Sequence, residues 1–421
     1  MFTPPDPSVK RKAILVHVTT VPESLLGFLG GQIGFMKEQG FDIHAVSSPG
    51  KWLEKFAARE RVAVHGVKML RQITPLKDCA TLVRLWRRLI AIRPHIVHSH
   101  TPKGGLLGMM AAWLARVPVR VYHIRGLPVM TAKGPKRFAL WCAEKASCRL
   151  ADRVFCISHS MAREAVKLGL CPTKKIRVLG SGGNGINAQH RFNPDRLAAG
   201  TRQRIRATFG IPADALVASF VGRIVRDKGM VELAGAWRKL RERFPTLHLL
   251  LVGPFEPQDP VPAEVEELFR NDPRIHLAGT VDDVSPYYAA MDVCVLPTYR
   301  EGLPGVLLEA AAMELPVVAT RVPGCVDAVV DGVTGTLVPP QNAAALAAAI
   351  GAYLIDPGLR RRHGLAGRQR VLSEFRRETI WQALYEEYGR LLQDKGLPAP
   401  AGCMEEAIPL VSDYLPKHRA A

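Results

Sequence analysis

Cysteine pairs, long apolar runs and acidic metal motifs are all missing from this chain of 421 residues. Its eight cysteines include no C-x-x-C pair and no metal-ligand spacing, so we expect reduced, mostly buried thiols in a cytosolic protein. The longest apolar run, residues 104–115, is too short to cross a bilayer. No small-residue cleavage site follows the basic stretch at 10–12, so we interpret that stretch as the lead-in to a strand, not as a signal peptide.

Acidic residues are scarce in the first half of the chain. Residues 1–200 contain 32 Lys and Arg against 11 Asp and Glu, whereas residues 201–421 contain 25 against 27. A basic half is expected to face nucleic acid, an anionic membrane or a phosphorylated substrate, unless it is only a solvated surface. With 48% apolar residues the chain can bury large cores, which excludes disorder as its main state.

Short apolar runs alternate with helical patterns, and the alternation begins twice. Such runs are typical of parallel strands covered on both faces. The strands expected in the first series are 13–18, 41–47, 96–100, 119–123, 153–157 and 176–179. Those expected in the second are 215–221, 248–252, 275–278, 293–297 and 316–319. Helices are expected at 77–92, 136–150, 229–244 and 378–392, among others.

The two series predict an α/β protein with two Rossmann-like, doubly wound domains. We place an N-terminal domain at 1–200, a C-terminal domain at 201–395 and a mobile tail at 396–421, and we expect the last helix to pack back toward the N-terminal domain. Ligands of open α/β sheets bind outside the carboxyl ends of the strands, so two such domains would face a central cleft.

The segment from Tyr299 to Ala310 follows an apolar strand and opens a helix. Pro304 suits the first helical position, which would leave the N–H groups of Gly305 and Val306 pointing at a phosphate or sugar oxygen. Glu301 in the loop and Glu309 on the helix could accept hydrogen bonds from ligand hydroxyls. The blander alternative is that Glu301 caps the helix and Glu309 pairs with a surface cation.

A second cluster ends the first strand of the C-terminal half. Arg223 and Lys228 are spaced to converge on an anion at that strand end, with a bidentate fork from arginine and a mobile point charge from lysine. The alternative, ordinary surface cations at a helix start, is weaker because the Glu301 segment lies in the same half.

These motifs resemble a known family. Glu301 to Glu309 is similar to the E-x7-E motif of retaining glycosyltransferases of family 4, which have the GT-B fold, and Gly222-Arg223 with Lys228-Gly229 is similar to their donor diphosphate motif. The resemblance covers about residues 12–392. It is closest to the bacterial capsule and O-antigen branch, through the segments 47–50, 73–78, 98–104 and 183–185.

The resemblance implies a nucleotide sugar bound mainly by the C-terminal domain. Arg223 and Lys228 would hold the diphosphate, Glu309 the ribose, and Glu301 the donor sugar, with the amides of Gly302 to Val306 nearby. Residues 276–281 would contact the nucleobase, and the N-terminal domain would present the acceptor. Negative charge builds on the leaving diphosphate during glycosyl transfer. Side-chain cations would stabilise it, so no metal or other cofactor is expected.

The sequence departs from the family at the segment 121–128. Many relatives have a His-Gly pair there with the histidine near the reaction centre, whereas this chain has Arg125-Gly126 and, two residues earlier, His123. Strand alternation predicts that His123 and Arg125 share a face. Arg125 could contact the phosphate or donor sugar but cannot act as a base. His98 and His100 resemble a metal pair without a third ligand, so we favour acceptor-site or structural roles for them.

The expected function is transfer of a hexose or N-acetylhexosamine, with retention, from a nucleotide sugar to a lipid-linked glycan. A UDP-sugar is favoured and a GDP-sugar stays open. A basic, partly apolar face is expected to contact anionic membrane peripherally. It would comprise the helix near 81–93, with Leu82, Leu85, Trp86 and Leu89 opposite Arg84, Arg87 and Arg88, together with Lys133, Lys136, Arg137, Lys145 and Arg149.

Two other functions remain open. The first is a nucleotide-sugar epimerase of the same fold, which would convert the donor with no acceptor present. The second is a basic nucleic-acid-binding protein, which is less favoured because neither an aromatic stacking platform nor a reading helix is apparent. We therefore expect no nucleic-acid partner.

Overall fold

The computed structural model describes residues 12–72 and 74–400, and these form two compact units. The N-terminal unit runs to Asn184 and also contains the chain from Glu378 onward, whereas the C-terminal unit is Gly185–Arg377. The boundary between the units therefore lies between Asn184 and Gly185, earlier in the chain than the boundary predicted at residue 200. Of the predicted tail, 401–421 lies outside the described residues, and Leu397 and Ala399 pack against the N-terminal unit.

The N-terminal unit is built on a seven-stranded parallel sheet of order β3-β2-β1-β4-β5-β6-β7. Its strands are β1 (Ile14–Val18), β2 (Asp42–Ser47), β3 (Ala63–Gly66), β4 (Ile96–His100), β5 (Val119–Ile124), β6 (Arg153–Cys156) and β7 (Ile176–Val178). Its helices are α1 (Pro22–Leu29), α2 (Gln32–Glu38), α3 (Lys51–Glu60), α4 (Pro75–Ile92), α5 (Pro102–Leu114), α6 (Gly134–Leu150), α7 (His159–Lys167) and α16 (Arg377–Gln393). The strand β3 was not predicted, because its sequence, Ala-Val-His-Gly, is not a continuous apolar run.

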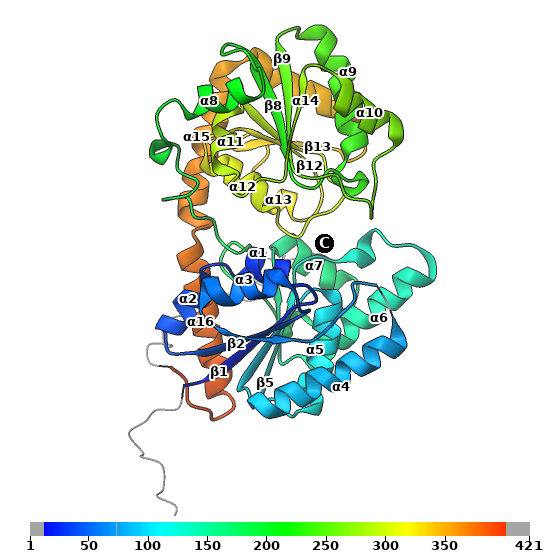
Figure 1. Cartoon of the computed structure of the whole chain (residues 1–421), viewed down its shortest axis with the longest axis vertical. Helices are drawn as coiled ribbons and strands as arrows, with labels where there is room; N and C mark the ends of the chain where they lie inside the picture. Colours follow the sequence, from blue (N-terminus) through cyan, green and yellow to red (C-terminus); the bar gives the residue numbers. More distant parts are fainter. Residues whose placement is uncertain (1–11, 73, 401–421) are drawn as a thin grey trace, which may run out of the picture. The chain divides into compact units, whose positions relative to one another are not determined.

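Two separate cores cover the two faces of this sheet. Helices α4 to α7 bury Leu85, Leu89 and Met161 against one face, and α1, α2, α3 and α16 bury Leu25, Phe56 and other side chains against the opposite face. Figure 1 shows α4, α5 and α6 on one side of the sheet and α2, α3 and α16 on the other. Both faces of the sheet are thus buried, which accounts for strands that are continuous apolar runs.

The C-terminal unit repeats this design with six parallel strands in the order β10-β9-β8-β11-β12-β13. The strands are β8 (Leu216–Val221), β9 (Leu247–Val252), β10 (Ile275–Gly279), β11 (Val293–Leu296), β12 (Val317–Thr320) and β13 (Gly335–Val338). The helices are α8 (Thr201–Thr208), α9 (Met230–Arg243), α10 (Ala263–Asn271), α11 (Ser285–Ala290), α12 (Gly305–Ala312), α13 (Cys325–Ala328), α14 (Ala343–Ile355) and α15 (Pro357–Glu374). The sequence analysis missed β13.

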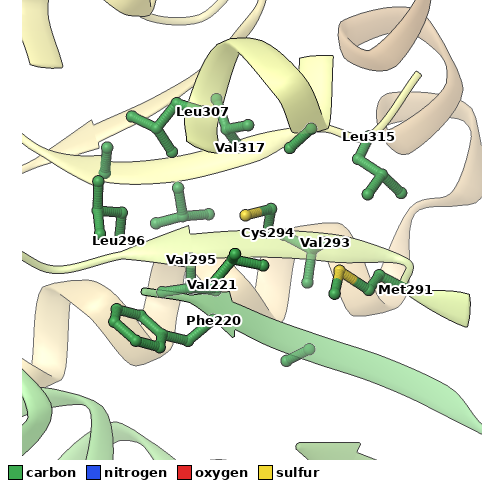
Figure 2. Packing of buried hydrophobic residues seen from close by; sticks show 14 of the residues in the cluster. Phe220, Val221, Met291, Val293, Cys294, Val295, Leu296, Leu307, Leu315 and Val317 are labelled. Carbon is green, nitrogen blue, oxygen red and sulfur yellow. The ribbon is translucent and has the colours of Figure 1, made fainter. Parts of the chain in front are cut away.

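The core of this unit surrounds its central strands. Figure 2 shows Leu307 of α12 and Val317 of β12 beside the side chains of β11, with Phe220 and Val221 of β8 close by. All these side chains are less than a tenth exposed. Burial of this kind, at about 25 cal/mol per Å² of apolar surface, holds the strand ends and the following loops in fixed positions.

Candidate active site

Strand order reverses between β8 and β11 in the C-terminal unit, and the predicted donor motifs follow these two strands. The loop after β8 contains a 3-10 turn, Arg226–Lys228, and the loop after β11 contains Glu301. The Lys228 ammonium donates a hydrogen bond to Glu301 Oε1, and both side chains are largely buried. Two motifs 73 residues apart in sequence therefore meet at the place where open α/β sheets bind ligands.

Close backbone contact holds these loops together. Gly229 has φ of +72°, and a Cβ atom there would lie 1.9 Å from the carbonyl oxygen of Pro297. Tyr299 donates its backbone N–H to Asp227 O at 3.0 Å, and the Arg300 guanidinium pairs with the Asp227 carboxylate at 3.0 Å. Only glycine fits at position 229. The close backbone contact between the loops after β8 and β11 therefore fixes the position of Lys228.

Convergence with Lys228 on an anion stays a prediction for Arg223, which has a different partner from Lys228 in this structure. Its Nη1 donates instead to Glu256 Oε2 at 2.6 Å, and the arginine side chain is half exposed. Each of the two cations has a carboxylate partner of its own. Because the Arg223–Glu256 pair is solvated, it contributes little to stability and can exchange for a ligand at small cost.

Helix α12 begins at Gly305, one residue later than predicted, and Pro304 takes the N-cap position. No side chain caps this end of the helix, and within the described residues the N–H groups of Gly305 and Val306 have no acceptor. Gly302 lies in the loop before the helix, where its carbonyl oxygen approaches Gly324. Two unpaired amides at the positive end of a helix are suited to bind an anion or a sugar hydroxyl.

Glu309 lies half-buried on α12 and does not pair with a surface cation, so the blander alternative is wrong. Its Oε2 accepts a hydrogen bond from the hydroxyl of Tyr288 at 2.9 Å. Burial raises the pKa of Glu309, and this hydrogen bond acts in the opposite direction. The second oxygen has no hydrogen-bond partner within the described residues, which leaves an acceptor for a ligand hydroxyl.

The predicted nucleobase segment, 276–281, includes the end of the edge strand β10. His276 Nε2 lies 2.8 Å from His248 Nδ1, and burial lowers the pKa of His276 to about 4. This imidazole is therefore neutral at pH 7.

In the N-terminal unit, His123 and Arg125 both lie beside His100, as strand alternation predicted. Arg125 Nε donates to His100 Nδ1 at 3.1 Å, and Nη1 donates to Asn184 Oδ1. The ring centroids of His123 and His100 are 5.7 Å apart. His123 is buried, and neither of its ring nitrogens has a partner in the described part of the chain.

The structure supplies a third histidine that the sequence analysis missed. His17 on β1 is in register with His98 on β4, and its Nδ1 lies 3.1 Å from His100 Nε2. Nitrogen atoms of His17, His98 and His100 lie within 4.8 Å of one another, a grouping that could hold a metal ion. The expectation that no third ligand lies near His98 and His100 is therefore wrong, because β1 and β4 are neighbours only in the folded sheet.

Burial keeps these histidines neutral. Desolvation and, after it, nearby charge lower the pKa of His17 to about 3, and the pKa values of His98, His100 and His123 also fall well below the usual range. Tyr388 of α16, whose hydroxyl lies 2.5 Å from His98 Nδ1, is another member that the sequence did not reveal. Its position 290 residues from His98 leaves no local signal.

The apolar residues exposed on the predicted membrane face are not the ones that were expected. Leu85 and Leu89 are buried, and Leu82 and Trp86 pack against the same core, so this stripe belongs to the interior. The large apolar side chains exposed on helices α4, α5 and α6 are Leu76, Val83 and Ile90 on α4, Trp113 and Leu114 on α5, and Phe138 on α6. Within the described residues, no helix is long and apolar enough to span a membrane.

Two family models match the chain, one in each half. The one described as "Glycosyl transferase 4-like domain" matches residues 33–182, and the one described as "Glycosyl transferases group 1" matches residues 215–356. Each match lies within one of the two units described above, and the C-terminal match includes the strands β8 and β11.

Similar whole proteins agree with the family matches. The capsular polysaccharide biosynthesis glycosyltransferase CapM of Staphylococcus aureus is 33% identical over 382 residues, covering 90% of this chain and 98% of its own. A UDP-Gal:alpha-D-GlcNAc-diphosphoundecaprenol alpha-1,3-galactosyltransferase of Escherichia coli is 26% identical, covering 75% of this chain and 81% of its own.

A solved structure shares the fold. Anabaena Alr3699/HepE, crystallised with UDP, has a TM-score of 0.71 and 19% identity, covering 90% of this chain and all of its own. The identity to CapM over nearly the whole chain, the two family matches and the paired parallel sheets lead to one conclusion. The chain belongs to the group 1, family 4 glycosyltransferases of the GT-B fold.

Proposed function

We propose that this glycosyltransferase moves a hexose or N-acetylhexosamine, with retention, from a nucleotide sugar to a polyprenyl-diphosphate-linked glycan in capsular polysaccharide biosynthesis. The observation that carries the proposal is the meeting of Lys228, Glu301 and the uncapped start of α12 at the strand-order reversal of the C-terminal unit. The functions named for the S. aureus and E. coli relatives support the process and the acceptor class. A UDP-sugar is the favoured donor, and the UDP complex of the Anabaena protein supports it.

The leaving diphosphate accounts for the charges of this site. As the glycosidic bond to phosphate breaks, negative charge grows on the diphosphate while the sugar becomes oxocarbenium-like. Lys228 and the amides of Gly305 and Val306 would stabilise that charge, an effect of about 3–4 kcal/mol for a well-placed donor. Arg223 would add a second cation after leaving Glu256. These side chains take the part that a metal ion plays elsewhere, and we propose that none is required.

Retention needs no protein nucleophile in this scheme. The acceptor hydroxyl attacks from the face that the diphosphate leaves, and the leaving phosphate assists in removing the acceptor proton. Glu301 would hold the donor sugar and Glu309 the ribose hydroxyls. Arg125 and His123 would act from the N-terminal unit, Arg125 as a cation because it stays protonated.

The test of donor binding is a thermal-shift and calorimetric screen of the full chain against UDP, GDP, ADP and their common sugars. A ligand at 100 times its Kd stabilises the folded state by about 2.7 kcal/mol. We expect a UDP response that Lys228→Ala strongly reduces and that Arg226→Ala, which replaces an exposed cation of the same turn, retains. No nucleotide response from the wild type contradicts the proposal, and conversion of the donor sugar with no acceptor present would establish an epimerase instead.

We also propose that helices α4 and α6 bring the enzyme to an anionic membrane. The only acidic residue of α6, Glu144, is buried and accepts a hydrogen bond from Tyr122 at 2.7 Å, so the outer face of the helix is basic. The only acidic residue of α4, Asp78, pairs with Lys103 at 2.6 Å. Phe138, 69% exposed, adds an apolar anchor between Lys136 and Lys145. Each cation near an anionic surface adds about 1 kcal/mol.

Sedimentation with lipid vesicles tests this face. We expect binding to vesicles containing phosphatidylglycerol, little binding to pure phosphatidylcholine, and a severalfold loss in Phe138→Ser. The matched control is Leu365→Ser, an exposed leucine of α15 in the C-terminal unit. Equal binding to both vesicle types, or equal loss in both variants, contradicts the membrane proposal. Binding to nucleic acid that falls steeply with salt, with no nucleotide-sugar response, would favour the nucleic-acid alternative.

A further inference from the structure

Arg125 carries a positive charge that no carboxylate neutralises among the described residues. Its polar contacts are with neutral acceptors, Nε with His100 Nδ1 at 3.1 Å and Nη1 with Asn184 Oδ1, and Nη2 has no hydrogen-bond partner in the described residues. The guanidinium carbon lies 4.4 Å from the centroid of the Phe28 ring. Such contacts fix the direction of a guanidinium without cancelling its charge.

Two successive hydrogen bonds, from Arg125 to His100 and from His100 to His17, orient the guanidinium. Because His100 Nδ1 accepts from Arg125, the proton of this neutral imidazole is on Nε2, which then donates to His17 Nδ1 at 3.1 Å. Both rings are fully buried, on neighbouring strands at the strand-order reversal of the N-terminal unit. This arrangement orients Arg125 with neutral groups only.

An anion fits this place better than a metal ion does. The three histidines have the spacing of metal ligands, and within the described residues Nε2 of His17 and of His98 is buried without a partner. However, His100 already uses Nδ1 to accept from Arg125, so its Nε2 is protonated and has no lone pair for a metal. A dication would also lie close to the guanidinium, which already acts against the charged form of each of these imidazoles. An oxyanion would instead neutralise the unpaired charge.

We propose that Arg125 is the anion-binding residue of a second substrate subsite, in the N-terminal unit, and that it takes an oxyanion of the substrate, a phosphate or a carboxylate. His100 and His17 are positioning residues for Arg125. His123 lines the same subsite, and because neither of its ring nitrogens has a partner among the described residues, it can bond a neighbouring hydroxyl. The inference deepens the proposed function, since the oxyanion belongs either to the diphosphate of the acceptor or to the carboxylate of an acidic sugar unit.

The test measures binding of simple anions, so it does not depend on turnover. Inorganic pyrophosphate and glucuronate are titrated into the full chain, with glucose as the neutral match of glucuronate. Lys228→Ala removes the diphosphate site proposed in the C-terminal unit and isolates the new subsite. We expect Lys228→Ala to keep one anion site, and Lys228→Ala/Arg125→Gln to bind that anion at least tenfold more weakly.

The two anions identify the source of the oxyanion. Pyrophosphate binding that depends on Arg125 assigns the subsite to the acceptor diphosphate, and glucuronate binding without a glucose response assigns it to an acidic sugar. The same affinity of Lys228→Ala and of the double variant for both anions overturns the proposal. Failure of the proposed donor site would appear separately, as a wild type that does not respond to UDP while the Arg125-dependent site persists.

The positioning role has its own variants. Asn at position 100 can present an amide oxygen near the place of Nδ1, whereas Leu cannot, so His100→Asn is expected to retain anion binding and His100→Leu to lose at least tenfold. Equal losses in the two variants, with folding intact, contradict the positioning role. Stoichiometric Zn²⁺ binding that His17→Ala abolishes and Arg125→Gln leaves unchanged would overturn the anion subsite in favour of a metal site.

Discussion

Lys228 and Glu301 form an ion pair across the carboxyl ends of two neighbouring parallel strands, β8 and β11. Their side chains are 18% and 13% exposed, so the pair is well shielded from solvent. In the proposed reaction Lys228 must turn from this carboxylate to the donor diphosphate. The carboxylate of Glu301 is then available to the donor sugar. Both residues therefore change partners when the nucleotide binds.

The pair predicts opposite binding effects for its two members. Lys228→Ala leaves Glu301 unpaired beside the diphosphate, so the Kd for UDP should rise at least tenfold, about 1.4 kcal/mol. Glu301→Gln releases Lys228, so affinity for UDP should stay the same or increase while turnover falls about a hundredfold. Calorimetry and a transfer assay measure the two quantities. Wild-type turnover in both variants would show that the site is wrongly assigned.

Gly229 predicts a stability loss that Gly332 does not. Both residues have positive φ, +72° and +74°, but a Cβ at Gly332 meets nothing within 4 Å, whereas one at Gly229 would lie 1.9 Å from Pro297 O. Gly332→Ala is expected to cost about 1–2 kcal/mol of unfolding free energy from backbone strain alone. Gly229→Ala should cost clearly more and also weaken UDP binding. Equal losses in urea unfolding would show that the close contact is unimportant.

Tyr288 predicts a pH shift in nucleotide affinity. Its hydroxyl favours the charged form of Glu309, whose pKa burial raises. Since ribose hydroxyls need the carboxylate as acceptor, affinity should fall as pH falls through the pKa of Glu309, and Tyr288→Phe should move that midpoint to higher pH. Tyr287→Phe, next to it on α11, serves as the control. A midpoint that Tyr288→Phe leaves in place would exclude the ribose role.

The buried histidines of the N-terminal unit predict loss of stability in acid. Their folded pKa values lie below the usual 6.5, so the unfolded chain binds protons that the folded chain does not. Stability is therefore fully present above pH 6.5 and is lost as pH falls below it. Each group adds up to about 1.4 kcal/mol per pH unit to the slope.

Tryptophan fluorescence can follow the unfolding of the N-terminal unit alone. Trp237 is the one tryptophan of the C-terminal unit, so in Trp237→Phe the fluorescence comes from the N-terminal unit only.

His123→Phe is the variant that tests this slope, because His123 has no hydrogen-bond partner to lose in the described residues. Between pH 6.5 and 5.5 its stability should fall less steeply than that of the wild type. His190→Gln, which removes an exposed histidine, should match the wild type. Stability that rises on acidification would show that these imidazoles are charged in the folded state.

The sequence by itself determined the fold class, the family and most of the strands, because buried parallel strands are continuous apolar runs and the Glu301–Glu309 motif is local. Lys228, Glu309 and Arg125 were also proposed as site residues from the local sequence, and their roles stay predictions. The edge strands β3 and β13 were not predicted, because Ala63–Gly66 and Gly335–Val338 contain glycine and polar residues and are not continuous apolar runs.

Only the tertiary structure decided which partners these residues meet. Arg223 pairs with Glu256, Tyr288 bonds Glu309, and His17 and Tyr388 join His98 and His100, each through a contact between elements distant in sequence. The physical reason is that the order of strands in a parallel sheet is set by packing on both faces. No local pattern records that β1 lies beside β4 or that α16 covers the histidines.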